Sequence, residues 1–378
     1  MKLGVDLSIL DELLPLGAKY YYNHKEVEPF SFFADHSGIS MVRLRLWHHP
    51  YDENGNPYGG GTNDLDCFLR LAKKAKEAGM EIMLDFHYSD FWVDPGRQRA
   101  PKAWDGLSYN EVVDALGKYT RDTLLKIKAE GIELSAIQVG NEITNGIVFP
   151  YGQLWSEEGS QIGGYKGLAG LLKAGYRACK EIYPNALTLC HLEHSASKEM
   201  QEEHFSKLLE EGVEFDVIGE SYYPYWHGTL NELEISLKNL QEKFHKPIWL
   251  VETGYEWGES LVEGHHNEFA DDTSDLFKVG NIDRRIPFPN TLQGQSDYYK
   301  ELITRMKRLG IGMIFYWEPA WVLVPNNGWA KEAGQVYCGL TPTKAENDWA
   351  NETLFDFEGN ATPAIDVFTQ EFVDSIDK

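Results

Sequence analysis

The stretch LSAIQVGNEITNG, residues 134–146, is a short apolar run that ends in Gly140, Asn141 and Glu142. Apolar side chains such as Leu, Ile and Val gain free energy on burial, whereas a carboxylate is costly to bury without a compensating partner. The run is typical of a parallel strand that is buried on both faces. A glutamate at the end of such a strand indicates that the position serves a site and not the core.

Seven further runs of this kind are spaced along the chain, at residues 2–8, 40–47, 81–88, 186–194, 215–223, 246–253 and 312–318. Segments with a helical spacing of apolar residues lie between them. One spans 62–79 and ends at Gly79, and another spans 108–131 and opens with a capping-box pattern, Ser108 to Glu111. Strands that alternate with helices in this way predict an α/β fold, a single (β/α)₈ TIM barrel, with one domain over residues 1–378.

Four long connections follow strands 3, 4, 7 and 8 of this predicted barrel, at residues 88–107, 142–163, 253–290 and 319–360. The loops that follow barrel strands form the active sites of such folds. A doubly wound sheet is the alternative, and it requires a glycine-rich phosphate loop after the first strand. The stretch GVDLSIL, residues 4–10, contains no such loop.

Composition excludes several classes of partner and of location. The formal net charge of −24 argues against nucleic acid and anionic membranes, whose phosphates would be repelled. The four cysteines have no CxxC spacing, which predicts free thiols in a reducing compartment. The first ten residues, MKLGVDLSIL, do not form a signal peptide, and no apolar run reaches transmembrane length. We therefore expect a cytoplasmic protein, or a secreted one if a leader has been removed.

Polar residues end every predicted strand, and in a barrel they converge on one face. They are Asp6, Arg43, Arg45, Asp85, His87, Asn141, Glu142, His191, Glu193, Glu220, Tyr222, Glu252, Trp317 and Glu318. Glu142 and Glu252, after strands 4 and 7, form the pair that glycoside hydrolysis requires. One carboxyl donates a proton to the leaving oxygen, and the other attacks the anomeric carbon or activates water. This chemistry requires no metal or organic cofactor.

The neighbours of these glutamates suit supporting roles. Arg45 is expected to hydrogen-bond the attacking carboxylate and keep it ionised, with Arg43 on the same face as the alternative. Asn141 is placed to hold a sugar hydroxyl, and Tyr222 to donate to the nucleophile. Tryptophans in the predicted loops can stack on sugar rings or pack in the core, and Trp317 is the leading candidate among Trp92, Trp104, Trp226, Trp257, Trp317, Trp321 and Trp329.

Four motifs resemble one known family. They are VRLRLWHHPYDENGNPYGGG (42–61), LDFHYSDFWVDPGRQRAPKAW (84–104), VGNEITNG (139–146) and VETGY (251–255). In these motifs the sequence resembles the endo-β-1,4-galactanases of glycoside hydrolase family 53, which belong to a clan of retaining (β/α)₈ glycosidases. The tail WANETLFDFEGNATPAI (349–365) is similar to the last loop and final helix of that family. The resemblance spans nearly the whole chain.

The resemblance implies a substrate and a set of site residues. The substrate is the β-1,4-linked galactan of pectin side chains, the backbone of type I arabinogalactan, cut internally. We separately expect the protein to be a monomer. Glu142 is implied as the acid/base and Glu252 as the nucleophile. Residues implied to shape the sugar site or line the cleft are Arg45, Asp85, His87, Asn141, Tyr222, Trp317, Trp92 and Trp104.

The sequence departs from the family pattern in two respects, one loop and the missing leader that secreted members usually carry. Bacterial relatives can carry a structural calcium between the loops after strands 7 and 8. Here the first of these loops reads EWGESLVEGHHNEFADDTSDLFKVGNIDRR, residues 256–285, and its acidic residues lack a regular ligand spacing. We therefore expect a solvated acidic loop and predict no metal site. The product length stays open, because this region often defines distant subsites, and an intracellular enzyme would act on imported galacto-oligosaccharides.

Three alternative functions remain. A metal-dependent barrel hydrolase would use His191, His194 and the pair His265–His266, but strand 1 offers only Asp6 as a ligand. His191 and His194 are also three residues apart on a strand, a spacing that directs side chains to opposite faces. A carbohydrate-binding barrel without catalysis is the second alternative. The third is a related glycosidase that cuts mannan, xylan or glucan, which fold alone does not exclude.

Overall fold

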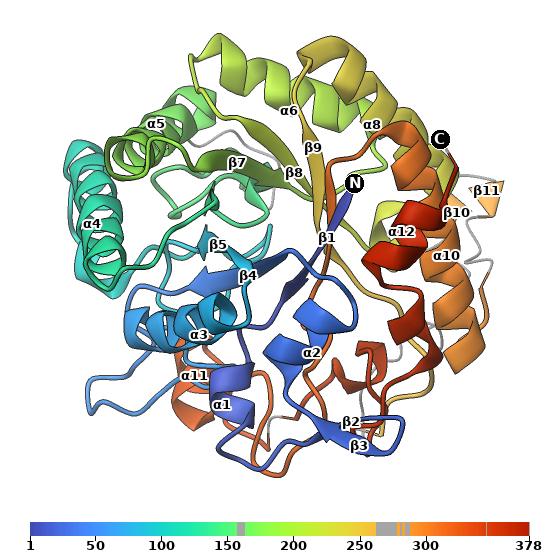
Figure 1. Ribbon diagram of the computed structural model, residues 1–378. Coiled ribbons are helices and arrows are strands. Elements are labelled where there is room, and N and C mark those ends of the chain that lie inside the picture. Colours follow the sequence, from blue (N-terminus) through green and yellow to red (C-terminus); the bar gives the residue numbers. More distant parts are fainter. Residues whose placement is uncertain (157–162, 262–277, 280–281, 284–287, 345, 378) are drawn as a thin grey trace.

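A closed barrel of eight parallel strands forms the centre of the computed structural model (Figure 1). The model describes residues 1–156, 163–261, 278–279, 282–283, 288–344 and 346–377. Around the barrel the strand order is β1-β12-β9-β8-β7-β6-β5-β4. These strands are β1 (Lys2–Asp6), β4 (Met41–Leu46), β5 (Glu81–Phe86), β6 (Ala136–Val139), β7 (Leu187–Leu192), β8 (Val217–Tyr222), β9 (Ile248–Thr253) and β12 (Met313–Tyr316). All eight predicted strands, and the TIM barrel, are confirmed.

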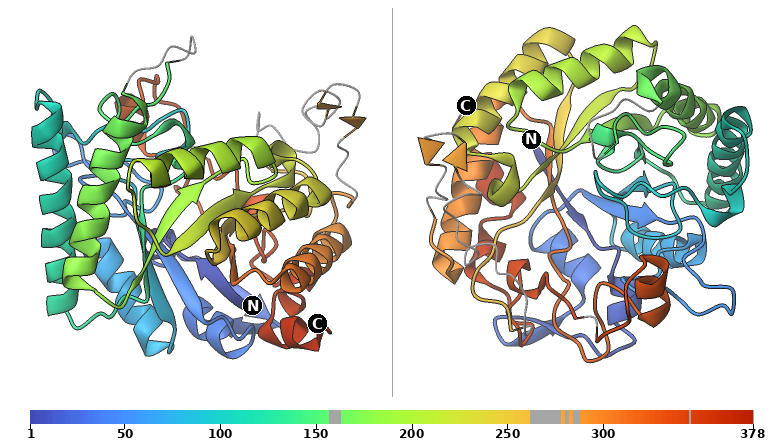
Figure 2. Two further views of the ribbon diagram at one scale, coloured as in Figure 1. Left: turned by 90° about the horizontal axis from the view of Figure 1, so that it is seen from above. Right: turned by 180° about the vertical axis from the view of Figure 1, so that it is seen from behind.

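Long helices cover the outside of the barrel, as the end-on and side views show (Figures 1 and 2). They are α3 (Leu65–Glu77), α4 (Tyr109–Ala129), α5 (Gly164–Ile182), α6 (Lys198–Glu210), α8 (Leu230–Phe244) and α10 (Leu292–Leu309). The predicted capping box between Ser108 and Glu111 begins α4. It satisfies free backbone N–H groups at the start of the helix.

Shorter elements lie in the connections between the barrel strands and in the segment that follows the last strand, β12. They are α1 (Leu10–Leu13), β2 (Tyr20–Tyr22), β3 (Lys25–Val27), α2 (Pro29–Asp35), α7 (Pro224–His227), β10 (Lys278–Val279), β11 (Ile282–Asp283), α11 (Glu332–Tyr337) and α12 (Gln370–Ser375). Strands β2 and β3 pair as an antiparallel hairpin. The predicted final helical segment, residues 361–377, is realised as the short 3₁₀ helix Pro363–Asp366 followed by α12.

Apolar side chains fill one part of the barrel interior. They form a buried cluster of Met41, Met83, Ala136, Leu189, Val217, Trp249, Val251, Met313 and Phe315. Gly4 makes room for this packing, because a Cβ atom at Gly4 would lie 2.4 Å from the ring of Phe315. Since side chains alternate along each strand, the next inward-facing positions toward the carboxyl ends include Arg43, Asp85 and Gln138. The polar end of the barrel is therefore the end that carries a site.

Two expectations from composition can be compared with the described residues. Cys67, Cys179, Cys190 and Cys338 are all free thiols, and the first three are buried. Among the described helices none combines the length and the apolarity that a membrane crossing requires.

Glu220, in β8, is a carboxyl group without a hydrogen-bond partner for either oxygen among the described residues. The side chain is fully buried. It alternates with Ser221, which contacts His191 inside the barrel, so Glu220 faces the helical layer. Burial, together with the charge of Glu193, raises the pKa of Glu220 well above its ordinary value. Burial therefore favours the protonated form of Glu220 in the folded protein.

This raised pKa predicts a stability that falls as the pH rises. Above a pH of about 4.3 the carboxyl of the unfolded chain ionises while that of the folded chain does not, so the free energy of unfolding decreases with pH. Glu220→Gln cannot ionise, and its Tm relative to wild type should therefore increase between about pH 5 and about pH 8. Thermal unfolding of both proteins across this range measures the effect. The exposed Glu77→Gln is the control, and a Tm difference for Glu220→Gln that does not change with pH would contradict the prediction.

Candidate active site

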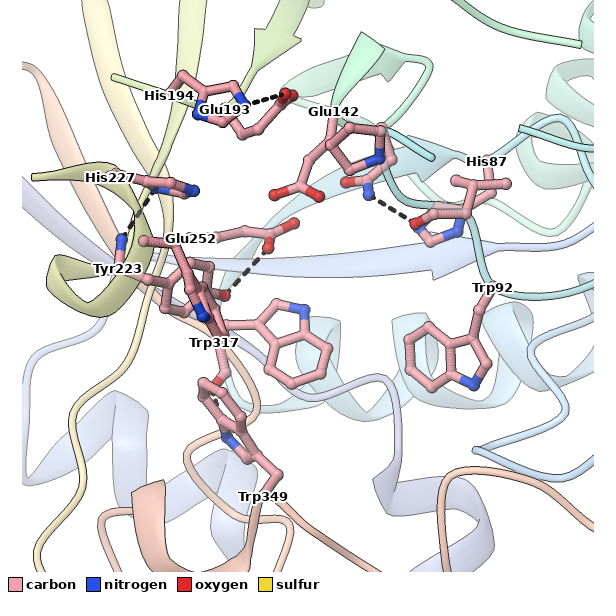
Figure 3. A pocket seen from close by; sticks show the side chains of 14 residues that line it. His87, Trp92, Glu142, Glu193, His194, Tyr223, His227, Glu252, Trp317 and Trp349 are labelled. Atoms are coloured by element: carbon pink, nitrogen blue, oxygen red, sulfur yellow. Dashed lines mark hydrogen bonds and ion pairs between the residues drawn. The ribbon is translucent and has the colours of Figure 1, made fainter. Parts of the chain in front are cut away.

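A pocket of about 420 Å³ opens where the predicted polar residues converge (Figure 3). Its walls come from the ends of β5, β6, β7, β8, β9 and β12 and from the loops that follow them. The lining residues are His87, Trp92, Val93, Pro95, Asn141, Glu142, Glu193, His194, Tyr223, Trp226, His227, Glu252, Trp317 and Trp349. The pocket thus combines aromatic faces with three carboxyl groups.

Glu142 and Glu252 face each other across this pocket (Figure 3). One oxygen of each carboxyl and one ring nitrogen of His191 all lie within 4.8 Å of one another. A tight turn after β6 brings Glu142 into position, because Gly140 has φ 89° and Glu142 itself is left-handed with φ 48°. The spacing fits the closer of the two carboxyl arrangements of glycosidases, at about 5–5.5 Å.

Glu252 is held by a cation and a phenol. The Arg43 guanidinium lies 2.9 Å from Oε1 of Glu252, and the Tyr223 hydroxyl donates to Oε2 at 3.0 Å. Burial raises the pKa of Glu252, and the charge of Arg43 opposes this rise. Arg43 in turn is fixed by Asp85 at 2.8 Å and Asp6 at 3.2 Å. Of the two facing glutamates, Glu252 is therefore the one held toward the ionised form.

Glu142 has the opposite environment. Burial raises its pKa well above the ordinary value, the charges of Glu252 and Glu193 add to this, and a hydrogen bond with Ser221 opposes it. In the described part of the chain no lysine or arginine forms an ion pair with Glu142. Two facing carboxyls with different protonation states can act as a general acid and a nucleophile.

A third carboxyl, Glu193, borders the same pocket. Its Oε2 accepts from the Thr144 hydroxyl at 2.8 Å, and its Oε1 lies 3.4 Å from Nε2 of His194. Burial raises the pKa of Glu193 to about 7. The sequence marked Glu193 only as a polar residue at a strand end, without a role.

Most of the sequence-predicted residues do meet at this pocket. Those that line it with Glu142 and Glu252 are His87, Trp92, Asn141 and Trp317. Asp85 lies buried beneath them and accepts from Arg43 and from Nε2 of His87, the latter at 3.0 Å. Nδ1 of His87 accepts from the Trp47 indole at 3.1 Å. Since both nitrogens of His87 are engaged, this residue braces Asp85 and offers the pocket only its carbon edge.

Arg45 does not make the contact expected of it. Its guanidinium pairs with Glu318, lies 3.6 Å from Asp6, and stacks 4.3 Å from the ring centre of Trp92. Arg43, the alternative on the same face, contacts Glu252 instead. Both arginines point into the barrel, and Arg45 turns toward the loop after β12, where Glu318 lies. Arg45 therefore packs against the indole of Trp92, which lines the pocket, and holds that ring in place.

Tyr222 and Trp104 also lie away from the pocket lining. The Tyr222 hydroxyl donates to the backbone oxygen of Gly228 at 2.9 Å. Because successive strand residues alternate and Ser221 points inward, Tyr222 points outward and Tyr223 points inward. Trp104 is only 4% exposed and packs edge-on against Tyr119, so it belongs to the hydrophobic core.

Several lining residues had no predicted role in the site. Tyr223, His227 and Trp349 fall in this group, whereas His194 was considered only as a metal ligand and Trp226 was among the tryptophan candidates. Alternation from Ser221 would have identified Tyr223. Trp349 comes from the long connection after β12, and its indole donates to the backbone oxygen of Trp317 at 3.2 Å. No local pattern in the sequence signals that contact.

The cluster of Glu142, His191 and Glu252 has a spacing that a metal ion could occupy. However, both ring nitrogens of His191 are engaged by protein groups. Nδ1 accepts from the Glu142 backbone at 3.3 Å and contacts Gln138 Nε2 at 3.0 Å, while Nε2 contacts the Ser221 hydroxyl at 2.8 Å. His191 thus offers no free ligand atom. His265 and His266, and the acidic residues 262–277 considered for calcium, lie outside the described residues.

Comparisons with known proteins agree with this geometry. The chain matches the model of Glycosyl hydrolase family 53 over residues 2–368. It is 32% identical to the endo-beta-1,4-galactanase of Bacillus subtilis (strain 168), over 97% of this chain and 84% of that protein. It is 34% identical to the arabinogalactan endo-beta-1,4-galactanase of Cellvibrio japonicus (strain Ueda107), over 98% of this chain and 90% of that protein.

Solved structures give the same result. The Ignisphaera aggregans GH53 catalytic domain superposes with a TM-score of 0.84 at 35% identity, over 97% of this chain and 94% of that one. A structure of fungal beta-1,4-galactanases superposes with a TM-score of 0.74 at 27% identity, over 97% of this chain and 98% of that one. The chain therefore belongs to glycosyl hydrolase family 53.

Proposed function

We propose that this glycoside hydrolase cleaves internal β-1,4-galactosidic bonds of galactan, the backbone of type I arabinogalactan, with retention of configuration. The observation that carries the mechanism is the pair Glu142 and Glu252, facing each other within 4.8 Å in opposite electrostatic settings. The substrate is inferred from the galactanase relatives and from the four motifs that resemble the family.

In the first step of this mechanism, a carboxylate oxygen of Glu252 attacks the anomeric carbon. The bond from that carbon to the glycosidic oxygen breaks, and Glu142 gives its proton to the departing oxygen. In the second step Glu142, now ionised, takes a proton from water. The water oxygen attacks the anomeric carbon, the glycosyl ester breaks, and Glu252 leaves as a carboxylate.

Neighbouring side chains support each state of the reaction. Arg43 and Tyr223 stabilise Glu252 as an anion, both before attack and when it is released. Asn141 accepts from Arg43 at 2.8 Å, which fixes its amide beside the reacting centre. Trp92 and Trp317 offer flat apolar faces to the C–H faces of sugar rings. We further propose that residues 1–378 work as one catalytic domain, as a monomer, and without a required cofactor.

Reducing-sugar release from debranched β-1,4-galactan tests this function. Wild type should release sugar from galactan but not from mannan, xylan or carboxymethyl-cellulose, and Glu252→Ala should abolish release because the nucleophile is lost. Glu142→Ala should lose much more activity on galactan than on an activated aryl galactoside, whose leaving group needs no proton.

Equal losses of Glu142→Ala on both substrates would contradict its acid role. Activity of wild type on another polymer would retain the mechanism and reject the galactan proposal. Activity confined to short galacto-oligosaccharides would instead point to an enzyme that acts on imported fragments.

Tyr223 and Tyr222 provide a matched pair of variants. Tyr223→Phe removes the hydroxyl that donates to Glu252, and a hydrogen bond to a charged group contributes about 1.5–3 kcal/mol. We expect kcat on galactan to fall roughly 10- to 100-fold. Tyr222→Phe removes a hydroxyl of the same type that, among the described residues, bonds to the Gly228 backbone, so it should leave kcat nearly unchanged. Steady-state kinetics measures both, and a larger effect of Tyr222→Phe on kcat would contradict this assignment.

A further inference from the structure

A buried glutamine connects the surroundings of the two facing glutamates. Gln138, in β6, is fully buried beneath the pocket. Its Oε1 accepts from Nε of Arg43 at 3.3 Å, and Arg43 holds Glu252. Its Nε2 lies 3.0 Å from Nδ1 of His191, the same atom that accepts from the Glu142 backbone. Gln138 thus contacts one direct partner of each glutamate.

These contacts determine the orientation of the Gln138 amide. Arg43 can only donate, so the atom of Gln138 that it contacts is the oxygen. The other end of the amide lies 2.6 Å from Oδ1 of Asp85, which is an acceptor. The Gln138 amide nitrogen therefore donates one hydrogen to Asp85, and its second hydrogen faces both Nδ1 of His191 at 3.0 Å and the Gly140 backbone oxygen at 3.1 Å.

The same contacts determine the hydrogen positions on His191. Nδ1 faces two N–H donors, from Gln138 and from the Glu142 backbone, so it must carry a lone pair. Nε2 then carries the hydrogen and donates it to the Ser221 hydroxyl at 2.8 Å. His191 is consequently a neutral imidazole with a defined tautomer.

The charge state of His191 matters because of where it lies. A ring nitrogen of His191 is within 4.8 Å of an oxygen of both Glu142 and Glu252. An opposite charge at such a distance lowers the pKa of a carboxyl by about 1–3 units. A cationic His191 would therefore favour loss of the proton that Glu142 must keep for its acid step.

Other charged groups also act on this histidine. Burial lowers the pKa of His191 well below its ordinary value, Arg43, His87 and His227 act in the same direction, and Asp85 opposes them. Asp85 is itself occupied by Arg43, by His87 and by Gln138. The glutamine amide thus separates His191 from the nearest strong anion on β5.

Glu142 is surrounded by groups of its own. It faces the charges of Glu252, Glu193 and Asp94 and a hydrogen bond with Ser221. His87, His194 and His227 line the same pocket, and His191 is the histidine whose ring nitrogen lies within 4.8 Å of oxygens of both Glu142 and Glu252.

We infer that Gln138 is a positioning residue that keeps His191 neutral, with its hydrogen on Nε2, so that no cation forms beside Glu142. The role rests on the proposed acid function of Glu142. Gln138 touches neither substrate nor reacting atom, and it acts through His191.

The isosteric variant Gln138→Glu tests this role, because it replaces a donor facing Nδ1 with an acceptor that favours a proton there. In the profile of kcat/KM against pH, the basic limb reports the pKa of the general acid, Glu142. The expected result is a shift of this limb to lower pH by about one unit or more, with activity near the acidic limb much less affected. If His191 stayed neutral, the added negative charge would instead raise the pKa of Glu142 and move the limb upward. A limb that moves up or stays in place would overturn the inference.

His191→Asn supplies the matched background, because asparagine cannot become a cation. Adding Gln138→Glu to His191→Asn should not lower the basic limb. An equal downward shift in both backgrounds would mean that position 138 acts on Glu142 without His191, which also overturns the inference.

Nitrogen-15 NMR of the histidine side chains in wild type gives a test that needs no variant to fold. His191 should report a hydrogen on Nε2 and a bare Nδ1 throughout the active pH range. A hydrogen on Nδ1 would overturn the inference. This readout is independent of the proposed function, whose failure would appear as absence of galactan hydrolysis or an unchanged leaving-group dependence in Glu142→Ala.

Discussion

The guanidinium group of Arg43 is the interaction on which the site depends. It is 1% exposed, and breaking a buried, paired charge of this kind costs about 3–5 kcal/mol. Its partners come from four different strands or from the residues that directly follow them, and they are Asp6, Asp85, Gln138, Asn141 and Glu252. One cation therefore sets the position of the nucleophile relative to the rest of the barrel, and it also fixes the glutamine that faces His191.

The rest of the fold stabilises this buried polar layer. An apolar cluster closes the interior below it, and the helical layer excludes water around it. At low effective dielectric the ion pairs are strong, and an unpaired carboxyl is forced to keep its proton. Arg43 forms such an ion pair with Glu252, whereas Glu142 has no ion pair with a lysine or arginine among the described residues. The same pocket thereby favours the protonated form more strongly at Glu142 than at Glu252.

Much of this arrangement could be predicted from the sequence. The apolar runs gave all eight strands, and their polar ends identified the pocket and both glutamates, because barrel strands converge at their carboxyl ends. The choice between Arg43 and Arg45 could not be predicted, since both point inward and only the three-dimensional path of the side chains decides which one reaches Glu252. From the sequence, Tyr222 is the residue expected to contact the nucleophile, whereas the adjacent Tyr223 makes this contact. Trp349 reaches the pocket from a loop distant in the sequence, which no local pattern could indicate.

The central claim is that Glu252 attacks the sugar directly, with Glu142 close enough to serve first as acid and then as base. The stereochemistry of the first product reports on this most directly. Proton NMR recorded immediately after wild-type enzyme is added to galactan distinguishes the two anomers before they interconvert. The account predicts that the new reducing end appears first as the β-anomer, because two displacements at the same carbon restore the original configuration. Initial appearance of the α-anomer would mean a single displacement by water, and it would contradict the role assigned to Glu252.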